Sequence, residues 1–246
     1  MALAPLSACS SGVADTSATR TSSRPAASTP VATETVWGRI SRPSCAVPDE
    51  GKFLHRHSSP GVITPVLLLG GGPRGVVLGA QANGGICQVM PFGRELADRG
   101  YHVALFEWRD PYPDSMAAAT TALADAGAKR IVVGGFSRGA LVGLGVAPRL
   151  GPKVVGAFSV SGGPSGSEGF PTVRSLARFR GPVLLVDSED DATFPPGTVR
   201  RIAARHKGPE QVLVLPGFDH ALRLLEGEHS GRVRAAIFDF LDRVTG

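Results

Sequence analysis

A serine set among glycines is the first residue in this sequence whose surroundings favour chemistry. Residues 131–141 read IVVGGFSRGAL, which places Ser137 in a G-x-S-x-G pentapeptide. The pentapeptide alone is weak evidence, because Gly and Ser also form ordinary tight turns. Its setting is more specific, since an apolar run of strand length precedes it and an apolar stretch of helical length follows it. In a strand–turn–helix setting, the glycines allow a serine hydroxyl to stand exposed on a sharp turn as a nucleophile.

A serine hydroxyl is a poor nucleophile without a base, and the base needs an acid that orients it. His220 lies in LPGFDHAL, just after the last strand-like run, and Asp191 lies in LLVDSEDDATFPP, just after the preceding one. The order serine, acid, histidine is the one expected when the nucleophile follows a buried strand in this way. Asp187 and Asp190, in the same stretch, are alternatives to Asp191 as the acid. The other histidines are weaker candidates for the base, and the last two of them are expected to be exposed: His55, His57, His102, His206 and His229.

The elements that must position these residues alternate along the chain. Short apolar runs separated by helix-like segments indicate a mostly parallel sheet covered by helices on both faces, so the fold class is α/β and doubly wound. Two earlier runs, 52–59 and 64–69, predict an N-terminal antiparallel hairpin. Further strands are expected at 75–81, 101–108, 129–136, 153–162, 182–188 and 210–217, and helices at 86–100, 113–128, 138–150, 196–207 and 230–244. The second helix is expected to have Asp114 or Ser115 as its N-cap.

Ligands of open α/β sheets bind beyond the carboxyl ends of the strands, so chemistry is expected there. The residues that follow the predicted strands are Gln81 to Gly84, Glu107 to Asp110, Ser137, Ser161 to Gly163, Asp187 to Asp191 and Phe218 to His220.

From about residue 45 to its end, the chain resembles the α/β-hydrolase superfamily. GFSRG is similar to the nucleophile elbow of that family, SEDDATFPP to its acid-bearing stretch, and PGFDHAL to its final histidine segment. The resemblance implies that Ser137 is the nucleophile and His220 the base. Counting back from Pro195 along the acid-bearing stretch favours Asp191 as the acid.

The same resemblance implies an oxyanion hole made of backbone N–H groups. One donor is Arg138, directly after the nucleophile. The other is either Ala82 or Gln81, because GVVLGAQANGG replaces the usual His-Gly pair of the oxyanion loop. Many relatives insert a helical lid where this chain has only residues 164–181, so little or no lid and a fairly open site are expected.

Composition limits the other classes of function. The chain has 246 residues with 42% hydrophobic residues, which suits one α/β domain with a full core. The formal charge is +5, but the basic residues are scattered singly and aromatics are only 6%. That pattern argues against nucleic-acid binding. No apolar run reaches the roughly 18 residues that a membrane span needs.

The N-terminus resembles a bacterial lipoprotein signal that ends at Cys9, which would then be lipidated and tether the protein to a membrane. The stretch before Cys9 lacks a basic start and is short for a signal. Residues 1–9 are therefore interpreted as a truncated signal remnant whose true start lies upstream, or else as a tail with an incidental cysteine. Residues 10–35 are rich in Ser, Thr, Ala and Pro and are predicted to be a disordered linker to a hydrolase domain at 36–246. A truncated lipoprotein signal implies an extracytoplasmic protein, whereas a tail with an incidental cysteine implies a cytoplasmic one.

The two remaining cysteines, Cys45 and Cys87, either pair in an oxidising compartment or remain as buried thiols. Neither has the spacing of a metal site.

The sequence thus predicts a serine hydrolase that cleaves small carboxylic esters through an acyl-enzyme and needs no metal or organic cofactor. Two alternatives remain: an amidase or peptidase with the same triad, and a non-catalytic binding protein with a hydrolase fold. The oligomeric state is not predicted.

Overall fold

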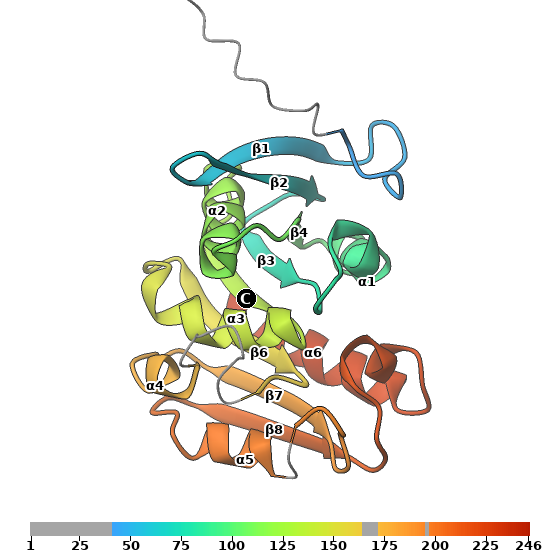
Figure 1. Cartoon of the computed structure of the whole chain (residues 1–246), viewed down its shortest axis with the longest axis vertical. Helices are drawn as coiled ribbons and strands as arrows, with labels where there is room; N and C mark the ends of the chain where they lie inside the picture. Colours follow the sequence, from blue (N-terminus) through green and yellow to red (C-terminus); the bar gives the residue numbers. More distant parts are fainter. Residues whose placement is uncertain (1–40, 164–171, 195–196) are drawn as a thin grey trace, which may run out of the picture. The chain divides into compact units, whose positions relative to one another are not determined.

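An eight-stranded sheet forms the centre of the protein (Figure 1). The computed structural model describes residues 41–163, 172–194 and 197–246. The strand order is β1-β2-β4-β3-β5-β6-β7-β8, in which β1 and β2 are antiparallel to their neighbours and β3 to β8 are mutually parallel. The predicted fold class, with its N-terminal hairpin, is confirmed. The strands are β1 (Lys52–Ser59), β2 (Val62–Leu69), β3 (Arg74–Gly79), β4 (His102–Phe106), β5 (Arg130–Phe136), β6 (Val154–Val160), β7 (Val183–Ser188) and β8 (Glu210–Leu215).

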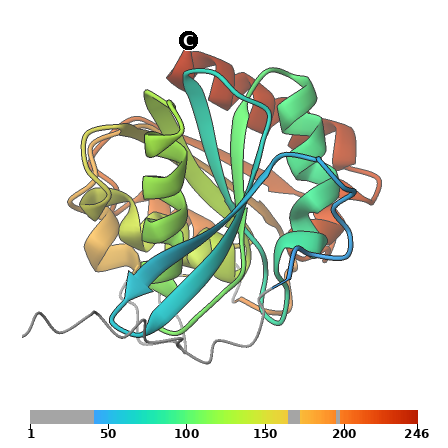
Figure 2. The same cartoon turned by 90° about the horizontal axis from the view of Figure 1, so that it is seen from above.

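Helices cover both faces of this sheet (Figure 2). One face packs against α1 (Ile86–Asp98), α6 (Ser230–Thr245) and the 3₁₀ turn η2 (Ala221–Leu225). The other packs against α2 (Tyr112–Asp125), α3 (Arg138–Val146), η1 (Ala147–Arg149), α4 (Thr172–Leu176) and α5 (Thr198–Ala203). Neighbouring residues of β3 therefore serve different cores: Val76 and Leu78 lie in the first, and Val77 in the second. Burial on both faces is the reason that the central strands β3 to β7 are mostly apolar.

The second helix begins earlier than the sequence predicted. Its N-cap is Pro111 and not Asp114 or Ser115, so that expectation was wrong. Proline at the start of a helix costs no hydrogen bond, because the first N–H groups have no partner within the helix. The buried Ser115 hydroxyl instead accepts the N–H of Arg109 and donates to its carbonyl oxygen, each at 2.9 Å. This pair of bonds holds the turn that leads from β4 into α2.

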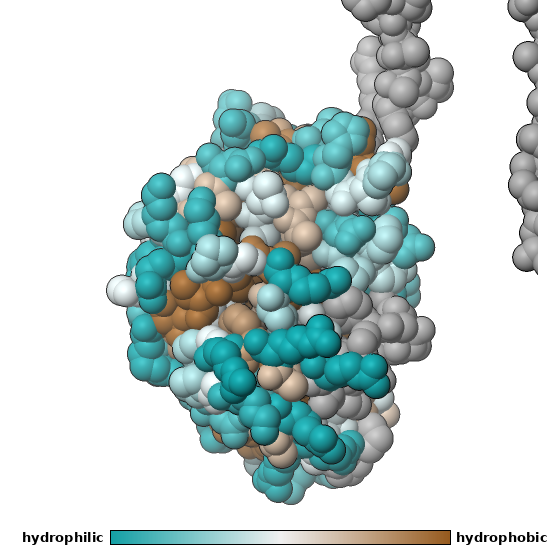
Figure 3. All heavy atoms as spheres, turned by 90° about the vertical axis from the view of Figure 1, so that its left-hand side faces the viewer, coloured by the Kyte–Doolittle hydropathy of each residue, from teal (hydrophilic) through white to brown (hydrophobic). Residues whose placement is uncertain are grey.

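Hydrophilic side chains cover most of the face on the left of Figure 1 and surround a hydrophobic area in its middle (Figure 3). Within the described ranges, no helix is long and apolar enough to cross a membrane. The large hydrophobic side chains that the described residues expose are Val47, Val212 and Phe218. Phe218 is 74% exposed and lies just before His220, so it can contact a molecule that reaches this end of the sheet.

Candidate active site

Ser137 lies on a sharp turn between β5 and α3. Its backbone angles are φ 49° and ψ −107°, which residues with a side chain rarely adopt. The turn is fixed from β6, because the Ser137 N–H donates to the carbonyl oxygen of Val160 at 2.9 Å. Strained conformations of this kind persist where the surrounding structure holds them, and they concentrate at active sites. The structure thus carries this serine at the carboxyl end of β5 on a turn of the nucleophile-elbow type.

The glycines on both sides of Ser137 have a steric reason. A Cβ atom on Gly135 or on Gly139 would lie 2.1 Å from the carbonyl oxygen of Gly79 at the end of β3. The Gly139 N–H also donates to the carbonyl oxygen of Ala80 at 3.1 Å. The turn therefore packs directly on the backbone of β3, and no larger residue fits at either end of the pentapeptide.

Asp191 and His220 are in contact. His220 Nδ1 lies 2.6 Å from Asp191 Oδ2, and the Thr193 N–H donates to Asp191 Oδ1 at 2.8 Å. Asp191 is only 3% exposed, and its burial alone would raise the pKa of the carboxyl group. The hydrogen bonds from His220 and Thr193 outweigh burial and lower the pKa of Asp191. The carboxylate therefore stays ionised beside the imidazole, whose side chain is 24% exposed.

The loop that carries His220 is fastened to two other strand ends. The Ala221 N–H donates to the hydroxyl oxygen of Ser161, just after β6, at 2.9 Å. The Ser188 hydroxyl, at the end of β7, donates to the carbonyl oxygen of Asp219 at 2.5 Å. These two bonds fix the backbone on both sides of His220, and sequence reasoning did not predict either of them.

The loop after β3 distinguishes the two predicted oxyanion donors. The N–H of Gln81 donates to the side-chain oxygen of Gln88 at 3.1 Å, so this donor is occupied. Ala82, which is exposed, is then the better candidate of the two. The carbonyl oxygen of Ala80 accepts from Gly139 and from Trp108 Nε1, at 3.1 and 3.2 Å, and ties this loop to the Ser137 turn. Arg138 begins α3 directly after Ser137 and places its guanidinium 4.4 Å from the centre of the Tyr112 ring.

Solved structures share this arrangement of elements. An esterase of Pyrococcus furiosus aligns over 80% of this chain and 92% of its own, with TM-score 0.68 and 17% identity. An α/β hydrolase of a Penicillium species aligns over 79% of this chain and 98% of its own, with TM-score 0.65 and 14% identity. This chain has the α/β-hydrolase fold. A dienelactone hydrolase-like promiscuous phosphotriesterase from metagenomic libraries is also similar, over 79% of this chain and 98% of its own, with TM-score 0.64 and 20% identity. No protein-family model and no curated protein matches the chain.

The alternative acids lie elsewhere on this α/β-hydrolase fold. Asp190 is exposed, and its N–H donates to the carbonyl oxygen of Gly217. Asp187 is buried at the end of β7, close enough to Asp191 for the charge of Asp191 to raise its pKa. Of the three carboxyl groups, the structure brings that of Asp191 against the imidazole.

The expectation that His206 is exposed was wrong. Its side chain is fully buried just after α5, beside the ring of Phe179, and burial lowers the pKa of the imidazole. His102, at the start of β4, is also buried, and burial lowers its pKa. Neither follows the carboxyl end of a strand that bears a candidate catalytic residue, so we do not place either of them in the site.

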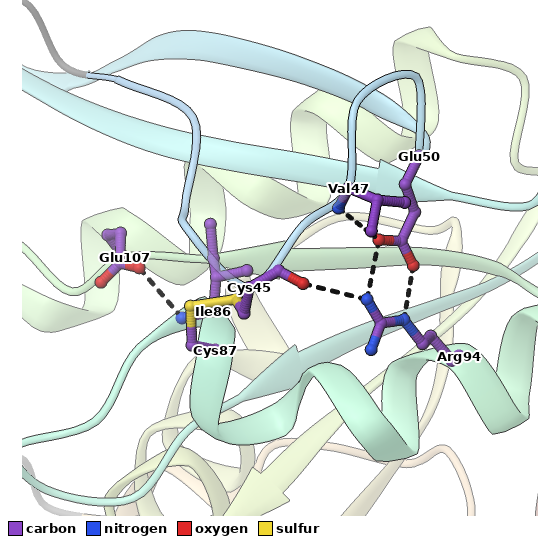
Figure 4. The surroundings of a disulfide bond; sticks show 7 residues. All are labelled: Cys45, Val47, Glu50, Ile86, Cys87, Arg94 and Glu107. Carbon is purple, nitrogen blue, oxygen red and sulfur yellow. Dashed lines mark hydrogen bonds and ion pairs between the residues drawn. A yellow bond between two sulfur atoms is a disulfide. The ribbon is translucent and has the colours of Figure 1, made fainter.

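A disulfide joins Cys45 to Cys87 in the first turn of α1, directly after the loop that carries the candidate oxyanion donors (Figure 4). Arg94 of the same helix donates to the carbonyl oxygen of Cys45 and pairs with Glu50, and the hydrogen bond from Arg94 lowers the pKa of Glu50 to about 2. The Glu107 carboxylate accepts the N–H of Ile86 at the start of α1, where it also faces the positive end of the helix dipole. Cys9, the predicted lipidation site, and the predicted linker lie outside the described residues.

Cavities lined by described residues lie at both ends of the sheet. One, of about 560 Å³, is at the amino ends of β5 to β8 and is lined by Arg130, Val155 and Phe240 among others. None of the candidate catalytic residues lines it, so we place the chemistry at the other end. A smaller cavity of about 120 Å³ lies there, between Asp187 and Phe194. Among the described residues, no cluster of His, Cys, Asp or Glu has the arrangement of a metal site.

Proposed function

We propose that this protein is a serine hydrolase that cleaves carboxylic esters through a Ser137–His220–Asp191 triad. The observation that carries the proposal is the contact of 2.6 Å between His220 and a buried Asp191, with Ser137 on a strained turn at the same edge of the sheet. An imidazole held by a buried carboxylate at the carboxyl ends of parallel strands is the arrangement that activates a serine hydroxyl. The names of solved structures with this fold, an esterase and a promiscuous phosphotriesterase among them, agree with an ester substrate.

The reaction follows from the positions of these groups. Because Nδ1 of His220 is bonded to Asp191, Nε2 is the nitrogen that takes the proton of Ser137. Ser137 Oγ attacks the ester carbonyl, and the N–H groups of Arg138 and Ala82 bind the resulting oxyanion. The tetrahedral intermediate expels the alcohol, which receives the proton from His220, and leaves an acyl-enzyme. Water then attacks the acyl carbonyl with His220 again as base, which releases the acid and restores Ser137.

The surroundings of His220 favour a small or protruding acyl group. The ring of Phe194 lies 6.0 Å from the imidazole, and Phe218 is exposed close by in sequence. Aromatic side chains at the mouth of a site bind apolar parts of a ligand. Residues 161–182 connect β6 to β7 and include the described helix α4, and this connection is too short to form a large helical lid. Short-chain esters are therefore the proposed substrates.

A fluorophosphonate probe and a graded panel of p-nitrophenyl esters test this proposal. We expect wild type to be labelled, Ser137→Ala not to be labelled, and turnover to be fastest with short acyl chains. A folded wild type that neither reacts with the probe nor cleaves any ester would contradict the proposal and leave the binding-protein alternative. Matching amides in the same panel separate the amidase alternative, which predicts efficient cleavage of the amides as well as of the esters, whereas the proposed esterase should leave the amides intact.

A further inference from the structure

Asp187 is a buried acid that the reaction described above does not use. It belongs to β7 and is 5% exposed. Its Oδ1 accepts the N–H of Ser188 at 3.0 Å, and the side chains of Asp191 and Ser161 lie close enough to its carboxyl group to shift the pKa of that group. Ser161 is the residue whose hydroxyl oxygen accepts the Ala221 N–H. Asp187 is therefore close both to Asp191, the candidate acid, and to Ser161, which holds the loop that carries His220.

Two carboxyl groups this close cannot both be ionised without a large repulsion. Burial, and then the charge of Asp191, raise the pKa of Asp187 to about 7. The pKa of Asp191 is lowered instead, because His220 and Thr193 donate to it. Glu189 and Arg200 are charged residues that line the same cavity of about 120 Å³ as Asp187. Of the two carboxyl groups, Asp187 is therefore the one that binds a proton more readily.

We propose that Asp187 is a positioning residue that keeps its proton and donates it in a hydrogen bond to Asp191, which holds that carboxylate against His220. The inference rests on the proposed function, since it gives Asp187 a part in the same triad. Asp191 then accepts from three sides: from His220 on Oδ2, from Thr193 on Oδ1, and from Asp187. A carboxylate with three donors is fixed in orientation, and so is the imidazole that it contacts.

The test uses variants that differ in a single donor. Asn at position 187 keeps a donor of the same size, whereas Ala removes it. We expect Asp187→Ala to lower kcat about tenfold to a hundredfold with KM nearly unchanged, as for the loss of a hydrogen bond to a charged group, and Asp187→Asn to restore most of kcat. Asp190→Asn is the matched control, because Asp190 is exposed in the same loop. Equal losses in Asp187→Asn and Asp187→Ala, or no loss in Asp187→Ala, would overturn the inference.

A measurement without turnover separates this inference from the proposed function. Carbon-13 NMR of the aspartate carboxyl groups should show one titration near pH 7 that is missing in Asp187→Asn. An active wild type without that titration overturns the inference alone. An inactive wild type that shows it overturns the proposed function and supports a proton shared by the two carboxyl groups.

Discussion

The side-chain oxygen of Gln88 accepts the backbone N–H of Gln81 at 3.1 Å, across the turn that enters α1. A Cβ on Gly84 would lie 1.9 Å from the same oxygen, so the amide of Gln88 fills the inside of this loop. The bond holds the Ala80–Gln81 peptide, one peptide before the one that carries the N–H of Ala82. We infer that it orients the proposed oxyanion donor without touching the substrate.

Removal of this amide should slow the reaction without weakening substrate binding. In Gln88→Ala, we expect kcat to fall about tenfold and KM to change less than twofold, because a misplaced oxyanion donor mainly affects the transition state. Steady-state kinetics with a short p-nitrophenyl ester measure both values. A normal kcat in the folded variant would show that the loop keeps its shape without Gln88.

The identity of the acid is tested by two neighbouring aspartates. Asp191→Asn should lower kcat about 10³- to 10⁴-fold, because an amide neither selects the correct imidazole tautomer nor stabilises its charged form. Asp190→Asn should retain nearly full activity, since its carboxylate is exposed and is not the one in contact with His220. The reverse pattern would assign the acid to Asp190.

Gly139, two residues after Ser137, should be important for the stability of the fold. In Gly139→Ala, the new Cβ would meet the carbonyl oxygen of Gly79 at 2.1 Å, and the cost should exceed about 3 kcal/mol because backbone must move. Gly231→Ala in α6 is the matched control: nothing lies within 4 Å of its Cβ, and it should stabilise the protein by about 0.5–1 kcal/mol. Urea unfolding measures both free energies. Equal stabilities in the two variants would contradict the close packing of the turn on β3.

Loss of the disulfide should weaken the fold near the proposed oxyanion loop. The bond joins residues separated by 42 positions, and its removal in Cys45→Ser, Cys87→Ser should cost about 2–4 kcal/mol of unfolding free energy. Guanidinium unfolding of wild type with and without a reductant gives the same comparison without mutation. No change in the unfolding midpoint on complete reduction would argue against the prediction.

Acid should destabilise the protein through its buried imidazoles. Burial lowers the pKa of His206, and Glu210 at 3.9 Å from Nδ1 opposes this to a smaller extent. The unfolded chain binds the proton at the ordinary imidazole pKa of 6.5 and the folded protein only at lower pH. Stability is therefore fully present above pH 6.5 and is lost as pH falls through the folded value, by up to about 1.4 kcal/mol per pH unit for one group. His206→Leu should reduce this slope in unfolding measured from pH 7 to pH 5, and an unchanged slope would assign it to other groups.

The sequence predicted the sheet and its order of elements because strands buried on both faces must be continuously apolar. It also placed Ser137, Asp191 and His220 at strand ends, since carboxyl ends of parallel strands share one edge. It could not predict that the Gln88 side chain accepts a hydrogen bond from the Gln81 N–H, or that the Ser161 hydroxyl accepts one from the Ala221 N–H. Both bonds depend on how separate parts of the chain approach each other. His206 was predicted wrongly for a related reason: the helix ends at Ala203, and the chain turns the imidazole into the core.

The disulfide also closes residues 45–87 into a covalent ring that contains the β1–β2 hairpin. Pro60 and Gly61 lie exposed at the tip of that hairpin, where a protease can reach the backbone. A single cut there would leave both fragments attached through sulfur. The nicked protein would migrate on a gel as an intact chain until a thiol is added, and it would keep α1 fastened to the segment before β1 after the chain itself is broken.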